Sequence, residues 1–143
     1  MSDAITLTVA FAGAWLTSNP RSTVDWYGRA RQVRAWRDAT VIACHAARAP
    51  HGITPVRISM VARSTGRAPV RDSMNLYPTV KAIVDGLTPR RVITRGKRVY
   101  VTPGYGLLPD DDDRHVLGHP TWTLEHHGGQ PCVLVTIAPV VGV

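Results

Sequence analysis

An apolar stripe at helical spacing between residues 76 and 87 is the strongest structural signal in this chain. It comprises Leu76, Val80, Ile83, Val84 and Leu87. Side chains at these intervals share one side of an α-helix, and an apolar side of this kind must be buried against other elements. Asn75 is a candidate cap for the predicted helix, and Pro78 is tolerated because it falls in the first turn.

Alternating and β-rich stretches predict strands on both sides of this helix. They cover residues 5–11, 56–62, 92–94, 98–101, 121–126 and 132–137. The middle two form a basic hairpin over 91–101, and the last two are predicted to be a closing pair. A longer helix is predicted from Trp26 to about Arg48, with Ala30, Val33, Ala39, Ile42 and Ala46 roughly along one side. Residues 103–106 are predicted to break the regular secondary structure before the acidic run.

The order of these elements predicts an α+β fold, with a mixed, largely antiparallel sheet packed by two main helices. The chain has 143 residues, which fits a single domain spanning 1–143 with a core of its own. Cys44 and Cys132 fall in a predicted helix and strand, so buried thiols are expected rather than a disulfide framework. No apolar stretch is long enough for a membrane span and the start is not a signal peptide, so a cytoplasmic protein is expected.

The charge balance is strongly basic, with 17 Lys and Arg against 10 Asp and Glu. This net charge of +7 indicates an acidic partner, and nucleic acid is the first candidate. Lysine occurs only at 81 and 97. The arginine bias suits forked binding of phosphate, but a GC-rich genome would produce the same bias.

Four of the ten acids stand together as Asp110–Asp113. Like charges this close repel unless a positive group lies among them, and a divalent cation is the obvious candidate. A basic body with one acidic, metal-binding spot suits an enzyme that cuts a polyanion. Asp72 precedes the stripe helix and Lys81 lies on it, so both are candidates for the same site, although acid-plus-lysine patterns are common.

Three segments in order resemble the RusA-type Holliday junction resolvases. They are Asp72–Leu76, Lys81–Leu87 and Gly106–Asp111, which are similar to the family's D-x-D-N-L, K-A-x-x-D-x-L and G-x-x-x-D-D. Residues 16–21 are similar to its early S-N-x-R loop. The resemblance implies a homodimeric, Mg²⁺-dependent endonuclease, with Mn²⁺ as a possible substitute, that nicks four-way or otherwise branched DNA. Two matched nicks suit a two-fold dimer.

The resemblance also implies roles for particular residues. Asp72, Asp111 and Lys81 are the expected catalytic residues, and Asp72, Asp110 and Asp111 are the expected metal ligands. The expected DNA contacts are Asn19, Arg21 and Arg71, together with Arg95, Lys97 and Arg98 of the basic 88–105 stretch, which lies outside the family pattern. For the hairpin residues a solvated basic loop is an equally good interpretation, and Asn19 and Arg21 suit a capping loop equally well.

The chain departs from the family pattern in three places. Met74 stands where the family has a second Asp, and a thioether is a poor ligand for Mg²⁺. Either Asp112 or Asp113 replaces that ligand, or the protein is a weak or inactive DNA binder on the same fold. Residues 77–79 are an insertion of nearly one helical turn, and the 88–105 stretch is longer than expected.

Several other groups have competing interpretations. Asp85 follows Lys81 by four residues, which suits a helical ion pair or a role in the site. The arginines of the first helix suit a solvated face or a DNA footprint. The histidines at 115, 119, 126 and 127 are poor candidates for a zinc site. His115 and His119 have i, i+4 spacing, but Gly118 and Pro120 argue against a helix there, and no cysteine pairing supports them. The tryptophans are expected in the core or at a dimer contact.

Overall fold

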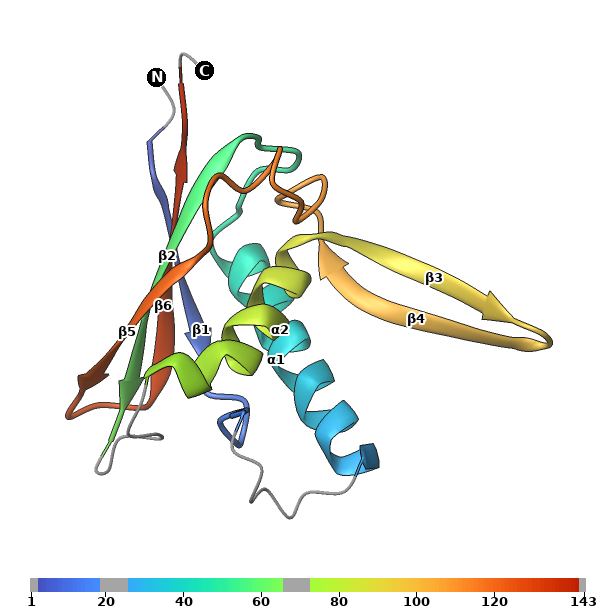
Figure 1. The fold of residues 1–143 in the computed structure, drawn as a ribbon, viewed down its shortest axis with the longest axis horizontal. Helices are drawn as coiled ribbons and strands as arrows, with labels where there is room; N and C mark the ends of the chain where they lie inside the picture. The colour runs from blue at the N-terminus through green and yellow to red at the C-terminus, as the bar shows by residue number, and fades with distance from the viewer. Residues whose placement is uncertain (1–2, 19–25, 66–72, 142–143) are drawn as a thin grey trace.

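The computed structural model describes residues 3–18, 26–65 and 73–141. Two helices cover one face of a four-stranded sheet, and a two-stranded arm projects from the body (Figure 1). The sheet contains β1 (Ile5–Ala10), β2 (Val56–Ser64), β5 (Thr121–His126) and β6 (Cys132–Pro139). The helices are α1 (Trp26–Ala46), η1 (Ser73–Leu76, one 3₁₀ turn) and α2 (Tyr77–Leu87), and the arm is β3 (Pro89–Arg95) with β4 (Arg98–Tyr105). The predicted α+β class is confirmed.

The sheet order is β1-β6-β2-β5, with β6 antiparallel to both β1 and β2 and with β5 parallel to β2. Both final strands were placed correctly, but the prediction that they form a closing pair is wrong. They lie on opposite sides of β2, and the segment between them passes the end of that strand, where the His127 amide donates to the Ser64 carbonyl at 2.9 Å. Alternation shows that a segment is a strand, but it does not show which strand is its neighbour.

The register of the sheet gathers its apolar side chains on the helix-covered face. Successive residues of a strand point to opposite faces, so paired positions form rows across the sheet. Two buried rows are Leu7–Val135–Met60 and Val9–Val133–Ala62. The five residues of the predicted stripe, Leu76 at the end of η1 and four residues of α2, are all buried and belong to the same hydrophobic core as these rows.

The start of α2 differs from the prediction. Residues 73–76 form the 3₁₀ turn, and Leu76, not Asn75, occupies the N-cap position without a side-chain capping bond. The predicted cap is therefore wrong, while Pro78 does lie in the first turn. Both cysteines are buried and free, as predicted, and burial raises the pKa of the Cys44 thiol to about 12.

The buried face of α1 is rotated from the predicted one. Ile42 is 68% exposed, whereas Trp36 is fully buried. Trp36 packs against the rings of Phe11 and Trp15, and its indole N–H donates to the Ala14 carbonyl at 2.7 Å. A buried indole brings a large apolar area and needs a partner for its N–H, so the aromatic cluster decides which face turns inward.

The arm is longer than the predicted 91–101 hairpin. Its strands are joined by Gly96-Lys97, and they continue to Pro89 and Tyr105 at the base. Pro103 and Gly104 therefore lie inside β4 rather than breaking the chain. Gly104 is required there because a Cβ would stand 2.2 Å from the Thr88 carbonyl oxygen across the ladder.

Two arginines of α1 hold the base of the arm. Arg34 donates to the Val101 carbonyl at 3.4 Å, and Arg37 donates to the Pro103 carbonyl at 3.0 and 3.1 Å. Arg29 also donates to a backbone carbonyl, that of Thr17. Among the described residues, this arginine series therefore bonds to neighbouring backbone in large part and is not simply a solvated face. No helix in the described ranges combines the length and apolarity that a membrane crossing needs.

Gly86 lets α1 and α2 approach closely, and we expect Gly86→Ala to destabilise the fold. A Cβ there would lie 2.8 Å from the Thr40 Cβ and 3.1 Å from the Arg37 carbonyl oxygen. Overpacking costs about 1–3 kcal/mol, while helix propensity returns about 1 kcal/mol, so a net loss of up to about 2 kcal/mol is expected. Urea denaturation measures the free energy of unfolding.

Gly128→Ala is the matched control, because nothing lies within 4 Å of a Cβ at that position. It should change the free energy of unfolding by less than about 0.5 kcal/mol. A stabilised Gly86→Ala variant would show that the helices can separate at little cost.

Candidate active site

Buried residues at both ends of the acidic segment fix its position in the fold. Leu107 and Leu108 are fully buried, and the Leu108 amide donates to the Leu87 carbonyl at the end of α2, at 3.1 Å. Val116 is buried on the other side, and the Leu117 amide donates to the Val56 carbonyl at 2.8 Å. The loop between these anchors, residues 109–114, is thereby held beside α2.

Lys81 links this loop to α2. Its ammonium group donates to Asp111 Oδ2 at 2.6 Å and to Asp85 Oδ1 at 2.8 Å. The predicted i, i+4 pair of Lys81 and Asp85 is therefore present. Arg37 of α1 reaches the other oxygen of Asp85 at 3.7 Å. The cations and carboxylates thus alternate in the order Arg37, Asp85, Lys81, Asp111.

The contact between Lys81 and Asp111 shifts the pKa values of both groups in the directions that strengthen their pair. The hydrogen bond from Lys81 holds the pKa of Asp111 below its ordinary value, against the opposing effect of partial burial. Burial lowers the pKa of Lys81, but the bonds to Asp111 and Asp85 outweigh it, so the pKa is raised overall. Burial is the main cause of the lowered pKa of Arg37. At neutral pH, Lys81 and Asp111 are therefore both charged.

The Asp112 carboxylate forms its contacts within its own loop. Its carboxylate accepts from the backbone amides of Arg114 and His115 and contacts the His115 imidazole Nδ1. The bond from His115 is the main cause of the lowered pKa of Asp112. Among the two acids that could replace the ligand missing at Met74, Asp112 is therefore the poorer candidate.

Asp113 lies at the same hollow as Asp111. We call it the carboxylate hollow, of about 110 Å³, and its polar lining includes Lys81, Asp111, Asp113 and His119. In the described part of the chain, Asp113 forms no ion pair within 4 Å, unlike Asp110, Asp111 and Asp112. Met74 is 65% exposed on the 3₁₀ turn and lines a neighbouring apolar hollow with His119.

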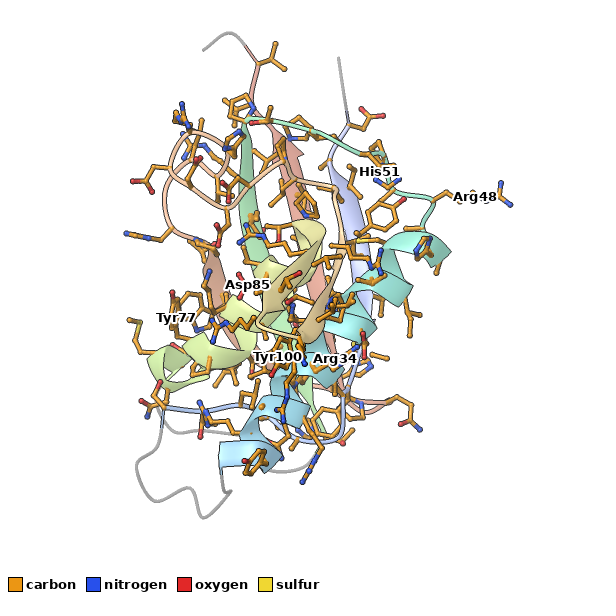
Figure 2. All side chains as sticks on the ribbon, turned by 90° about the vertical axis from the view of Figure 1, so that its right-hand side faces the viewer. Arg34, Arg48, His51, Tyr77, Asp85 and Tyr100 are labelled. Atoms are coloured by element: carbon orange, nitrogen blue, oxygen red, sulfur yellow. The ribbon has the colours of Figure 1, made fainter. Side chains whose placement is uncertain are left out.

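A second hollow lies on the other side of the Lys81–Asp111 pair. This arm hollow, of about 390 Å³, is lined by Arg37, Lys81, Asp85, Thr88, Arg91, Ile93, Thr102 and Asp111. Arg91 of β3 also approaches Asp110 at 3.7 Å. Figure 2 looks along the arm, with Asp85 behind it near the centre of the view. The Lys81–Asp111 pair therefore borders both hollows.

Four residues predicted for the site lie outside the described ranges: Asn19, Arg21, Arg71 and Asp72. The convergence of Asp72 with the acidic loop thus stays a prediction. The described chain resumes at Ser73, which lines the apolar hollow beside His119 and accepts a bond from the Trp122 indole at 2.6 Å. Arg95, Lys97 and Arg98 lie at the far end of the arm, away from the acids.

The donor set suits a hard divalent cation in part. Asp111 and Asp113 offer carboxylate oxygens at one hollow, which is the ligand type that Mg²⁺ prefers. Within the described residues no group of three or more His, Cys, Asp or Glu side chains gathers as a metal site. A complete set therefore requires a further ligand, for which Asp72 is the candidate.

Sequence reasoning missed Arg37 and Arg91 as parts of the site. Arg37 lies 48 residues from its partner Asp85, so no local spacing links them. Arg91 was counted only within a basic hairpin. The available signal was weak: each arginine lies on an element that the connectivity places beside α2 or the acidic loop.

The sequence matches no protein-family model and no curated protein. The resemblance to the RusA-type resolvases therefore stays a prediction based on the three segments described above.

We expect the Lys81–Asp111 pair to stabilise the fold by about 0.5 kcal/mol, the scale of partly exposed pairs. A double-mutant cycle with Lys81→Met and Asp111→Asn measures this coupling. The coupling is fully present above the ordinary pKa of Asp111, 3.8, and is lost as pH falls through the lower folded-state pKa. It is fully present below the ordinary pKa of Lys81, 10.5, and is lost as pH rises through the raised one.

Urea denaturation of the four proteins across pH gives the profile. The coupling should be level between about pH 5 and pH 9. A coupling that survives unchanged at about pH 2, where the Asp111 carboxyl of the unfolded chain is protonated, would show that the contact is not an ion pair.

Proposed function

We propose that this protein is a divalent-metal-dependent endonuclease that nicks branched DNA, with the four-way junction as the model substrate. The observation that carries the proposal is the contact between Lys81 and Asp111 at a carboxylate hollow in a chain of net charge +7. The basic body attracts a polyanion, while the carboxylates provide a cation site. The resemblance of residues 72–111 to the RusA-type resolvases supports the same reaction.

Each residue has a distinct role in this proposal. Asp72 and Asp111 would hold Mg²⁺, with Mn²⁺ as a substitute. Such an ion, when bound, polarises a phosphoryl oxygen and lowers the pKa of water. Asp110, the third expected ligand, does not line the carboxylate hollow and would have to give up its contact with Arg91. Lys81 neutralises the negative charge that grows on the phosphate, and its contact with Asp85 keeps the ammonium oriented.

Asp113, rather than Asp112, would replace the ligand that Met74 cannot provide. Asp113 lies at the carboxylate hollow, whereas Asp112 is bonded to its own loop. The thioether of Met74 binds Mg²⁺ poorly. A functional enzyme with this sequence therefore depends on Asp113.

We propose a homodimer as the active form. Two matched nicks in a four-way junction require two equivalent sites, and two-fold symmetry supplies them. The described surface offers large exposed apolar side chains, including Met74 and Tyr77 beside the carboxylate hollow.

We expect Asp111→Asn to reduce nicking of a labelled four-way junction by at least about 100-fold, because it removes a metal ligand and the partner of Lys81. Asp113→Asn should produce a loss of similar size, and EDTA should abolish nicking. Asp3→Asn is the control, because it removes the same charge from an exposed position before β1. The readout is strand cleavage resolved on a denaturing gel with Mg²⁺ or Mn²⁺.

Melting temperatures of the variants establish that each is folded. A folded wild-type protein that cuts no branched DNA with either metal contradicts the endonuclease proposal.

Met74 supports a second candidate function, a DNA-binding protein on the same fold with weak or no catalysis. In that case the wild-type protein binds a junction without metal but does not cut it. Met74→Asp should then restore metal-dependent nicking, because it returns a carboxylate to the family position. Efficient nicking by the wild-type protein would exclude this candidate.

A further inference from the structure

The two faces of the arm differ in chemistry. Across an antiparallel pair, directly opposed residues share a face, and successive pairs alternate. One face carries the pairs Arg91–Thr102, Ile93–Tyr100 and Arg95–Arg98, and we call it the inner face. The outer face carries the pairs Val92–Val101 and Thr94–Val99.

The inner face is continuous with the candidate active site. Arg91, Ile93 and Thr102 line the arm hollow together with Lys81 and Asp111. Farther out on the same face lie Tyr100 and the Arg95–Arg98 pair. A strand that is bound at Lys81 and continues outward would therefore run along this face.

The inner face combines an exposed ring with cations. Tyr100 is 46% exposed and Ile93 is 40% exposed, on an arm that extends into solvent (Figure 1). Residues 89–105 contain five Arg or Lys and no Asp or Glu. Aromatic rings that stack on bases, within a positive groove that follows the phosphates, are the usual elements of single-strand recognition.

The spacing along the arm suits a nucleic-acid strand. Arg91 and Arg95 are four residues apart on β3, which is about 13 Å in an extended strand. Phosphates of one DNA strand recur at about 3.4 Å of duplex axis, so the two cations can serve different phosphates. Tyr100 lies between them, opposite Ile93.

We propose that the inner face binds unpaired bases of DNA, with one base stacked on Tyr100 beside Ile93 and with Arg95 and Arg98 on the phosphates. This inference rests on the proposed function, because it takes the bound strand to continue from the candidate active site. Charge favours this partner over a second copy of the chain. All charged residues of the arm are positive, and a second copy of the chain has a net charge of +7, so the two would repel each other.

Binding of three DNAs tests this inference: a labelled single strand, a linear duplex and a four-way junction, each measured by fluorescence anisotropy in EDTA. Tyr100→Ala should weaken binding of the single strand and the junction by about 10-fold, the effect of one lost stacking contact. Duplex binding should stay within about twofold of wild type, because its bases are already stacked. Tyr100→Phe keeps the ring and should bind like wild type.

Val99→Ala is the matched control, because Val99 neighbours Tyr100 in sequence, is 62% exposed and lies on the outer face. It should leave all three affinities unchanged. Tyr100→Ala that binds the single strand like wild type overturns this inference alone. This inference is also overturned if Val99→Ala loses as much DNA affinity as Tyr100→Ala does. It is overturned as well if sedimentation shows that Tyr100→Ala acts only by converting a dimer to a monomer.

A wild-type protein that binds none of the three DNAs overturns the proposed function together with this inference. The two failures are therefore distinct, because the first appears in the variant and the second in the wild type.

Discussion

The arrangement of the site depends on the bonds that the Lys81 ammonium group donates to two carboxylates. This group lies between the carboxylates of Asp111 and Asp85, which belong to different segments. Each of the first three acids of the loop also has a basic partner: Arg91 for Asp110, Lys81 for Asp111, and Arg114 with His115 for Asp112. The protein's own cations therefore relieve the repulsion within the acidic run. Repulsion alone does not require a metal ion, so the metal proposal depends on the shared hollow of Asp111 and Asp113 and on the family resemblance.

The same network joins the arm to the site. Arg37 donates to the Pro103 carbonyl in β4 and also contacts Asp85, the second partner of Lys81. Burial disfavours the charge of Arg37, and its pKa is lowered accordingly. Contacts with the Asp85 carboxylate and with the backbone carbonyls of Pro103 and Asp85 compensate for that cost. At the end of β4, the Tyr105 ring stacks on His51, with 4.3 Å between the ring centres. An isolated two-stranded hairpin is marginally stable, so these contacts at its base explain how the arm can project.

Local sequence patterns predicted the elements of this fold better than their partners. The stripe predicted for α2 is buried at every position, because residues on one side of a helix recur with a period of 3.6, although Leu76 lies in the 3₁₀ turn before α2. The face of α1 was predicted wrongly, because Trp36 joins an aromatic cluster from a distant segment, and that cluster outweighs the weaker aliphatic pattern. The strands β5 and β6 were located correctly, but the period of two does not specify a neighbour. In the site, the Lys81–Asp85 pair follows from spacing, whereas Arg37 and Arg91 come from tertiary packing and left no local signal.

The proposed function requires a chain with four adjacent acids to approach DNA, and the distribution of charge permits this. The acidic loop by itself repels phosphate, but the arm on one side adds five cations within residues 89–105. The Debye length at physiological salt is about 8 Å, so a strand lying on the arm is screened from acids that are farther away. Only the phosphate at the Lys81–Asp111 pair would lie close to the carboxylates, which is where a bound cation would reverse the local charge. In the proposed function, binding along the arm and chemistry at the loop would therefore be separable steps, and only the second would depend on metal.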